Sequence, residues 1–154
     1  MRRERIIVLL LGAWVLSACA SFPRMAESRD PLSAAEHVSL GDVYLAHGEK
    51  KPAIQQYQMA LAQDRRQVPA LMALGNIAFE NREWGNARSY FRRALKASPG
   101  NPGIMNNLAM VDVAEGKHLD RAQKLINQAL PNAGPLTPYL LDTQAQIAAH
   151  SALK

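Results

Sequence analysis

The chain has 154 residues, and removal of the first 18 leaves 136, which is the size of a single domain. Its 18 Lys and Arg residues against 13 Asp and Glu give a formal charge of +5, but three arginines and one glutamate lie within residues 1–5. The remainder carries about +3, which argues against nucleic acid as a partner. The only cysteine, Cys19, leaves no pair for a disulfide.

The first 18 residues have the pattern of a secretory signal peptide. Residues 1–5 are basic, residues 6–15 are apolar, and small residues lead up to Cys19. The apolar stretch is about ten residues long, half of the roughly 20 that a membrane-spanning helix needs. In the alternative reading, Cys19 is a small apolar residue inside a buried segment, where free cysteines are common.

The stretch Leu16-Ser17-Ala18-Cys19 resembles the lipobox of bacterial lipoproteins. This resemblance implies that residues 1–18 are removed and that Cys19 becomes the first residue and carries the acyl chains, such as palmitate. Ala20, in place of an aspartate, implies the outer membrane, with the protein facing the periplasm. An ordinary secreted protein and an uncleaved anchor are the alternatives. If the chain is a lipoprotein, residues 19–33 form the lipidated N-terminus and a short polar tether.

A period of 34 residues follows. Leu40-Gly41 recurs as Leu74-Gly75 and as Leu108-Ala109, and each copy continues with a second apolar segment. That segment contains small and large apolar residues at matching positions, after one inserted residue in the third copy: Ala53, Ala87 and Ala122, then Tyr57, Phe91 and Ile126.

These copies resemble the tetratricopeptide repeat, a helix–turn–helix unit of 34 residues. The resemblance implies an all-α solenoid of three repeats, over residues 34–67, 68–101 and 102–135, with a capping helix in residues 136–154. The small residues Gly41, Gly75 and Ala109 are expected where two helices approach closely. The large apolar residues are expected to fill the space between neighbouring pairs. The third copy departs most from the pattern, with Asp112 at the usual tyrosine position.

No catalytic or metal-binding pattern is present in the sequence. The four histidines do not lie at a ligand spacing such as i, i+4, and neither a glycine-rich phosphate loop nor a nucleophile motif is found. We therefore expect a protein that is not an enzyme and that holds no cofactor or metal.

The resemblance also implies a concave groove, lined by the first helix of each repeat, that receives a segment of another protein. Asn76 and Asn107 match asparagines that hold a ligand's backbone in peptide-binding members, although asparagine also serves helix ends and helix contacts in these repeats. Other members bind a C-terminal carboxylate with lysines and arginines, and this chain has Met72, Tyr139 and Thr143 at those positions. Position by position, the expected groove consists of Val38, Asp42, Leu45, Met72, Asn76, Phe79, Asn106, Asn107, Met110 and Val113, with Gln146 from the cap.

The second helix of the second repeat carries a basic set: Arg88, Arg92, Arg93 and Lys96. Arg88 and Arg92 are one turn apart and are expected to face outward. A solvated face is one interpretation, and contact with anionic lipid headgroups is the other. Together these features predict a lipid-anchored adaptor in an envelope machine, since lipoproteins of type IV and tight-adherence pilus systems, which support secretin assembly or pilus biogenesis, share this layout. A scaffold for peptidoglycan hydrolases or synthases and a structural subunit of a polysaccharide-export complex are the alternatives.

Overall fold

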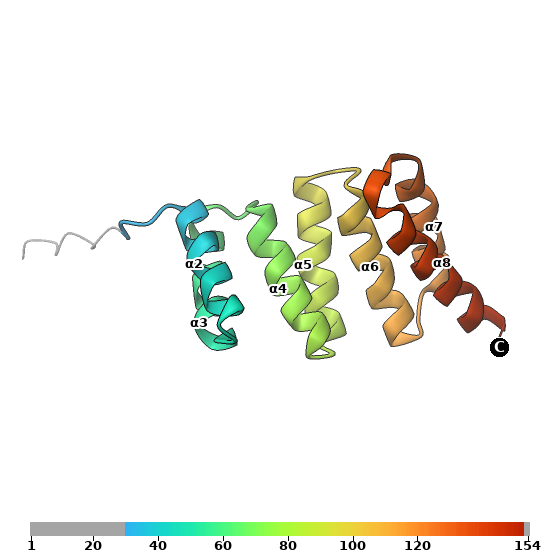
Figure 1. The fold of residues 1–154 in the computed structure, drawn as a ribbon, viewed down its shortest axis with the longest axis horizontal. Helices are drawn as coiled ribbons and strands as arrows, with labels where there is room; N and C mark the ends of the chain where they lie inside the picture. Colours follow the sequence, from blue (N-terminus) through green and yellow to red (C-terminus); the bar gives the residue numbers. More distant parts are fainter. Residues whose placement is uncertain (1–29, 153–154) are drawn as a thin grey trace, which may run out of the picture. The chain divides into compact units, whose positions relative to one another are not determined.

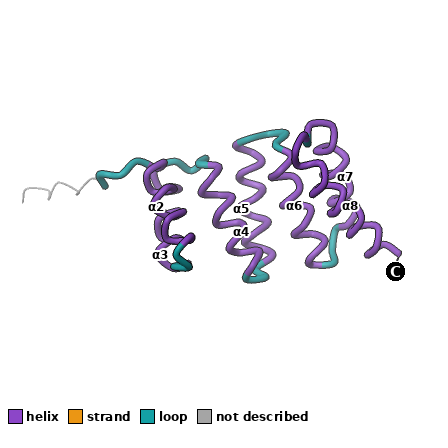
Figure 2. Tube along the Cα trace, viewed as in Figure 1, coloured by secondary structure: helices purple, strands orange, loops and turns teal. Residues whose placement is uncertain are grey.

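The computed structural model describes residues 30–152, and these form helices joined by short turns (Figures 1 and 2). The helices pair as α2 with α3, α4 with α5 and α6 with α7, and α8 packs on both helices of the third pair. Their bounds are α2 Ala34–Ala46, α3 Lys50–Gln63, α4 Val68–Glu80, α5 Trp84–Ala97, α6 Pro102–Glu115, α7 Leu119–Ala129 and α8 Thr137–Ala152, with two 3₁₀ turns, η2 Leu130–Asn132 and η3 Gly134–Leu136, before α8. The all-α solenoid predicted from the period is confirmed.

Two of the first helices, α2 and α6, begin with a side-chain cap. Ser33 caps α2, because its hydroxyl accepts a hydrogen bond from the Glu36 backbone N–H at 3.3 Å while the Glu36 carboxylate accepts from the Ser33 N–H at 2.7 Å. Hydrogen bonds from the Ser33 hydroxyl and N–H lower the pKa of Glu36. Asn101 caps α6, whose first residue is a proline.

The turns inside the pairs explain the inserted residue of the third copy. Residues 47–49 and 81–83 form equivalent turns in which the middle residue, Gly48 or Arg82, has a positive φ of 77° or 59°. In the third pair, α6 is 14 residues long where α2 and α4 have 13, and its turn uses Gly116 and His118 at φ 67° and 55°. The extra residue therefore lengthens one helix and changes one turn, and the pairing of the helices is kept.

A glycine opposite an aromatic ring sets the distance between the two helices of the first two pairs. A Cβ atom on Gly41 would lie 2.6 Å from Cε1 of Tyr57, and a Cβ on Gly75 would lie closer still to Phe91. Both rings are buried. Ala109, at the same position of the third pair, can carry a methyl group because the residue opposite in the repeat is the smaller Ile126. Tyr57 and Phe91 contact the glycine of their own pair, and each also belongs to a buried cluster that includes residues of the next pair. This agrees with the expectation that these side chains fill the space between neighbouring pairs.

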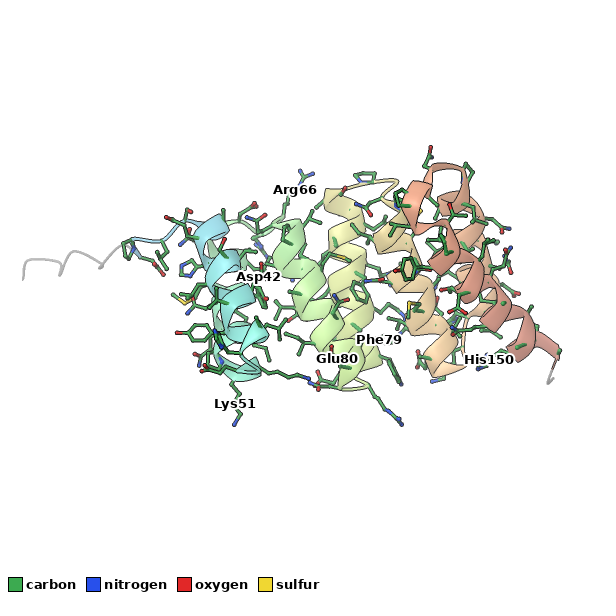
Figure 3. All side chains as sticks on the ribbon, in the orientation of Figure 1. Asp42, Lys51, Arg66, Phe79, Glu80 and His150 are labelled. Atoms are coloured by element: carbon green, nitrogen blue, oxygen red, sulfur yellow. The ribbon has the colours of Figure 1, made fainter. Side chains whose placement is uncertain are left out.

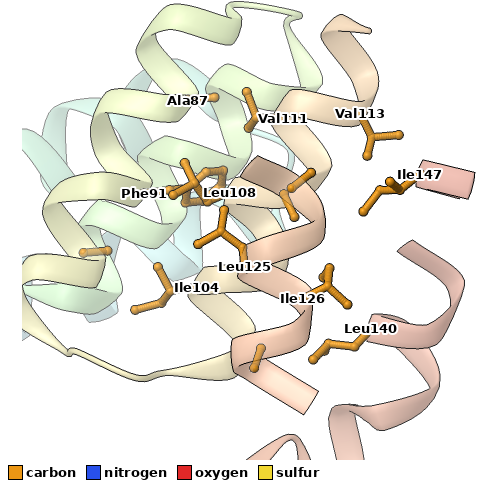
Figure 4. Close-up of a cluster of buried hydrophobic side chains, with 14 of the residues drawn as sticks. Ala87, Phe91, Ile104, Leu108, Val111, Val113, Leu125, Ile126, Leu140 and Ile147 are labelled. Carbon is orange, nitrogen blue, oxygen red and sulfur yellow. The ribbon is translucent and has the colours of Figure 1, made fainter. Parts of the chain in front are cut away.

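The apolar core runs through the pairs and is closed by α8. One cluster of buried side chains joins α2, α3 and α4, and a larger one extends from α4 to α8 (Figure 4). Leu140 and Ile147 of α8 are 1% and 3% exposed. The last helix therefore covers the apolar face of the third pair, which is the role that a terminal cap must fill in a solenoid.

A buried carboxylate ties three helices together. The Asp112 side chain on α6 has no exposed surface and accepts hydrogen bonds from the guanidinium groups of Arg88 on α5 and Arg121 on α7, with Nε of Arg121 at 2.7 Å. Arg88 also pairs with Glu115, whose pKa falls to about 2 because of its hydrogen bonds with Lys117 and Arg88. The prediction that Arg88 faces outward is therefore wrong: its side chain turns toward α6.

We expect Gly75→Ala to lower the free energy of unfolding by about 1–3 kcal/mol, because the added methyl group overlaps the Phe91 ring. Denaturant unfolding followed by circular dichroism measures the change. Gly85→Ala on α5 is the control, since a Cβ there meets nothing within 4 Å. Phe91→Ile gives the second repeat the isoleucine of the third, and it should lower the free energy of unfolding less in the Gly75→Ala background than in the wild type. Equal stability of Gly75→Ala and wild type would contradict the contact between Gly75 and Phe91.

We expect Asp112→Asn to lower the free energy of unfolding by about 3 kcal/mol or more, because Arg121 loses its carboxylate partner and Arg88 loses one of its two. The matched control is Asp142→Asn on α8, where an exposed aspartate bonds only to Gln146 within the described residues. Denaturant unfolding of both variants checks the difference. Loss of similar size in both would mean that the buried charges do not hold the helices together.

Candidate functional site

Four of the residues predicted to line a groove meet at one place. Asn76 and Phe79 on α4, together with Asn107 and Met110 on α6, surround a hollow of about 60 Å³. The buried Phe91 ring of α5 also lines this hollow; it was expected between neighbouring pairs but not among the groove residues. Figure 3 labels Phe79 among the side chains on the ribbon.

The two asparagines bond to each other across neighbouring repeats. Nδ2 of Asn107 donates to Oδ1 of Asn76 at 3.1 Å. Each side-chain amide has both a donor and an acceptor group, so this bond leaves the amino group of Asn76 and the carbonyl of Asn107 available. A donor and an acceptor side by side match the C=O and N–H of a peptide backbone.

Apolar side chains flank this amide pair. Phe79 is half-buried and makes an edge contact with Trp84, with ring centroids 5.4 Å apart. Trp84 is the first residue of α5, so this contact holds the ring of Phe79, on α4, against the start of α5. The ring is thereby placed beside the hollow and retains accessible surface for a partner.

A second hollow of about 270 Å³ continues the surface toward α8. Asn107 and Met110 line both hollows, and Leu136, Tyr139 and Leu140 are added from the other side. Tyr139 is 67% exposed and Leu136 is 36% exposed. This apolar contribution was not predicted, because position 139 stood out in the sequence only for lacking the cation of the carboxylate-binding members.

Asn106 also lines the second hollow but is 7% exposed. Its Nδ2 lies 3.4 Å from the sulfur of Met110, and its Oδ1 is buried with no hydrogen-bond partner among the described residues. Its side chain therefore contributes mainly to the wall of the hollow.

Two predicted groove residues do not reach the surface. Val38 is 8% exposed and packs in the cluster of the first pair, and Val113 is 3% exposed and lies near Ile147 of α8 (Figure 4). The prediction that they line a groove is wrong because both face the cores.

The remaining predicted residues lie away from the two hollows. Asp42 is exposed and accepts a hydrogen bond from the Tyr57 hydroxyl at 2.7 Å. The pKa of Tyr57 is raised, mainly because its hydroxyl is buried and also because it donates this hydrogen bond to Asp42. Leu45 and Met72 are half-buried against the apolar core, and Gln146 is exposed and bonds to Asp142.

The site is electrically neutral, since no charged side chain lines either hollow. Among residues 30–152, no cluster of His, Cys, Asp and Glu is arranged to hold a metal ion. None of the described helices has the length and apolar character needed to cross a bilayer. Cys19, the predicted lipidation site, lies outside the described residues.

The chain is similar to a curated protein in sequence and to solved proteins in fold. The chain is 30% identical over 92 residues to cellulose synthase operon protein C of Pseudomonas fluorescens (strain SBW25), a match that covers 60% of this chain and 7% of that protein. The first tetratricopeptide domain of Spaghetti (RPAP3), solved with the HSP90 peptide SRMEEVD, aligns with a TM-score of 0.71 at 17% identity, over 80% of this chain and 96% of that one. MamA aligns with a TM-score of 0.60 at 17% identity, over 80% and 81% of the two chains.

Two family models, both described as tetratricopeptide repeat, match residues 38–102 and 78–147. Together they extend over all three helix pairs and most of α8. The helix pairs, the glycine contacts and these matches agree, and the chain belongs to the tetratricopeptide-repeat family.

Proposed function

We propose that this protein is an adaptor that binds an extended segment of a partner protein along the two hollows between α4, α6 and α8. The observation that carries the proposal is the hydrogen bond between Asn76 and Asn107, which leaves one donor and one acceptor available to the backbone of a partner segment. An extended peptide offers alternating N–H and C=O groups, so this pair can hold it without reading its sequence.

The apolar walls define the kind of segment that fits. Phe79, Met110 and Tyr139 offer seats for apolar side chains on either side of the amide pair. The solved relative with an HSP90 peptide supports a peptide-binding role, but the neutral lining here favours a segment without an acidic end. The partner segment is therefore expected to be uncharged and rich in apolar residues.

The adaptor is further proposed to be anchored by lipid on Cys19, in the bacterial outer membrane and facing the periplasm. Support comes from the signal pattern of residues 1–15 and the lipobox-like Leu16-Ser17-Ala18-Cys19. Its pathway is pilus or secretin assembly, in which lipoproteins with the same layout take part. On this proposal the protein is not an enzyme and needs no cofactor.

A polysaccharide-export complex is the second candidate pathway. It is favoured by the similarity to cellulose synthase operon protein C, whose name places that protein with a polysaccharide synthase. A scaffold for peptidoglycan hydrolases or synthases would use the same groove. The partner captured by the groove separates these pathways.

We expect the full chain, expressed in a bacterium with an alkyne-tagged fatty acid, to incorporate the label on Cys19. Cys19→Ala should abolish labelling and leave the precursor uncut, because the thiol is the acceptor of the lipid. Labelled protein on a gel and mass spectrometry of the N-terminus measure both effects. An unlabelled wild-type chain would rule out the lipid anchor.

We expect Asn76→Ala to weaken partner binding by about 0.5–1.5 kcal/mol through the lost hydrogen bond. Phe79→Ala should cost about 2 kcal/mol or more, since a buried aromatic anchor is lost. The partner is first captured from solubilised envelopes and identified by mass spectrometry, and affinities are then measured by calorimetry. Arg92→Ala, an exposed change on α5, is the control and should bind normally. Normal binding by both groove variants, with loss in Arg92→Ala, would move the site to the opposite face.

A further inference from the structure

A basic hollow lies apart from the groove, where α3 and α5 end. It is lined by Arg65 and Arg66 after α3, by Arg93, Lys96 and Ala97 of α5, and has a volume of about 410 Å³. Two contacts hold Arg93 at its edge. The guanidinium carbon lies 5.9 Å from the centre of the Tyr90 ring, and an amino group of Arg93 donates to the Arg65 carbonyl at 3.4 Å.

The four cations of this hollow have no carboxylate partner among residues 30–152. Elsewhere in the same stretch, four cations form ion pairs (Lys50, Arg88, Lys117 and Arg121), and four exposed ones do not (Lys51, Arg82, Arg92 and Lys124). The hollow differs from these in that its four unpaired cations line one space. The nearest acid along the chain, Asp64, accepts a hydrogen bond from the Arg66 backbone N–H.

The ends of the helices do not balance these cations. The C-terminal end of a helix carries about half a negative charge, so α3 and α5 together contribute about one. Even with Asp64 counted in full, about two positive charges remain unbalanced around one hollow. An anion with one or two charges, such as a phosphate group, would complete the site.

The hollow lies at the end of the helix pairs at which Leu32 and Ser33 lead into α2. Nε2 of Gln63, the last residue of α3, donates to the Leu32 carbonyl at 2.7 Å. Cys19 precedes Leu32 by 13 residues, which span at most about 45 Å when extended. Figure 3 places Arg66 at this end of the helices and Lys51 at the other.

We infer that this hollow binds the phosphate headgroups of anionic membrane lipids and so docks the repeats against the membrane that holds the tether. The inference rests on the proposed lipid anchor, since only an anchored chain stays within reach of the bilayer. The hollow differs from the basic set expected from the sequence, because Arg65 and Arg66 line it and two expected members do not. Arg88 bonds to Asp112, and Arg92 is exposed outside the hollow. Docking by this end leaves the groove of α4, α6 and α8 free to hold a partner.

The test uses the full chain in nanodiscs of phosphatidylcholine, with and without phosphatidylglycerol, and measures hydrogen exchange of residues 64–67 and 97–101. Exchange should be slower in the discs that contain phosphatidylglycerol, and added salt should remove the difference. Each neutralised cation should lower the ratio of docked to undocked molecules about five-fold, so Arg66→Gln with Lys96→Gln should lower it about 25-fold. Lys51→Gln with Lys124→Gln, two exposed cations outside the hollow, should leave exchange unchanged.

Three results would overturn the inference. Equal exchange in both kinds of disc would show that anionic lipid does not bind. The same slowing by inorganic phosphate in phosphatidylcholine discs would make a free phosphate the ligand. The double variant could instead melt at a lower temperature while its hydrogen exchange still differs between the two kinds of disc. The cations would then stabilise the ends of the helices and not bind lipid. Failure of the lipid anchor is read separately, from fatty-acid labelling of Cys19.

Discussion

The contact between Gly75 and the Phe91 ring is the constraint on which the candidate site depends. Because Gly75 has no side chain, the ring lies directly against the backbone of α4, and it also forms the floor of the hollow below Asn76. A side chain at position 75 would push Phe91 or α4 aside. The same residue pair therefore sets the packing of the second repeat and the depth of the binding surface.

The second requirement is that neighbouring repeats keep their relative position. Asn76 belongs to α4 and Asn107 to α6, so their 3.1 Å hydrogen bond depends on how the second and third pairs pack. The carboxylate of Asp112 links α5, α6 and α7 through two arginines. A buried charge network of this kind is costly unless every member is paired, and it permits few alternative arrangements. The departure from the repeat pattern at position 112 thus has a structural role.

Much of the fold follows from the period of the sequence, because the small and large apolar positions recur every 34 residues. Contacts between repeats do not follow from it. Val38 and Val113 were expected in the groove because their helix positions repeat, but packing against other helices buries both. The period could not show that Arg88 turns inward, since its partner Asp112 lies 24 residues away on another repeat. The hollow of Arg65, Arg66, Arg93 and Lys96 likewise joins two distant segments.

The central claim is that the surface around Asn76 and Phe79 receives the partner protein. Photo-cross-linking in living cells tests it most directly, with benzoylphenylalanine placed either at Phe79 in the groove or at Arg92 on the exposed side of α5. We expect a discrete cross-linked partner from position 79 and none from position 92, and Asn76→Ala should reduce the yield at position 79. A partner that cross-links from position 92 and not from position 79 would contradict it.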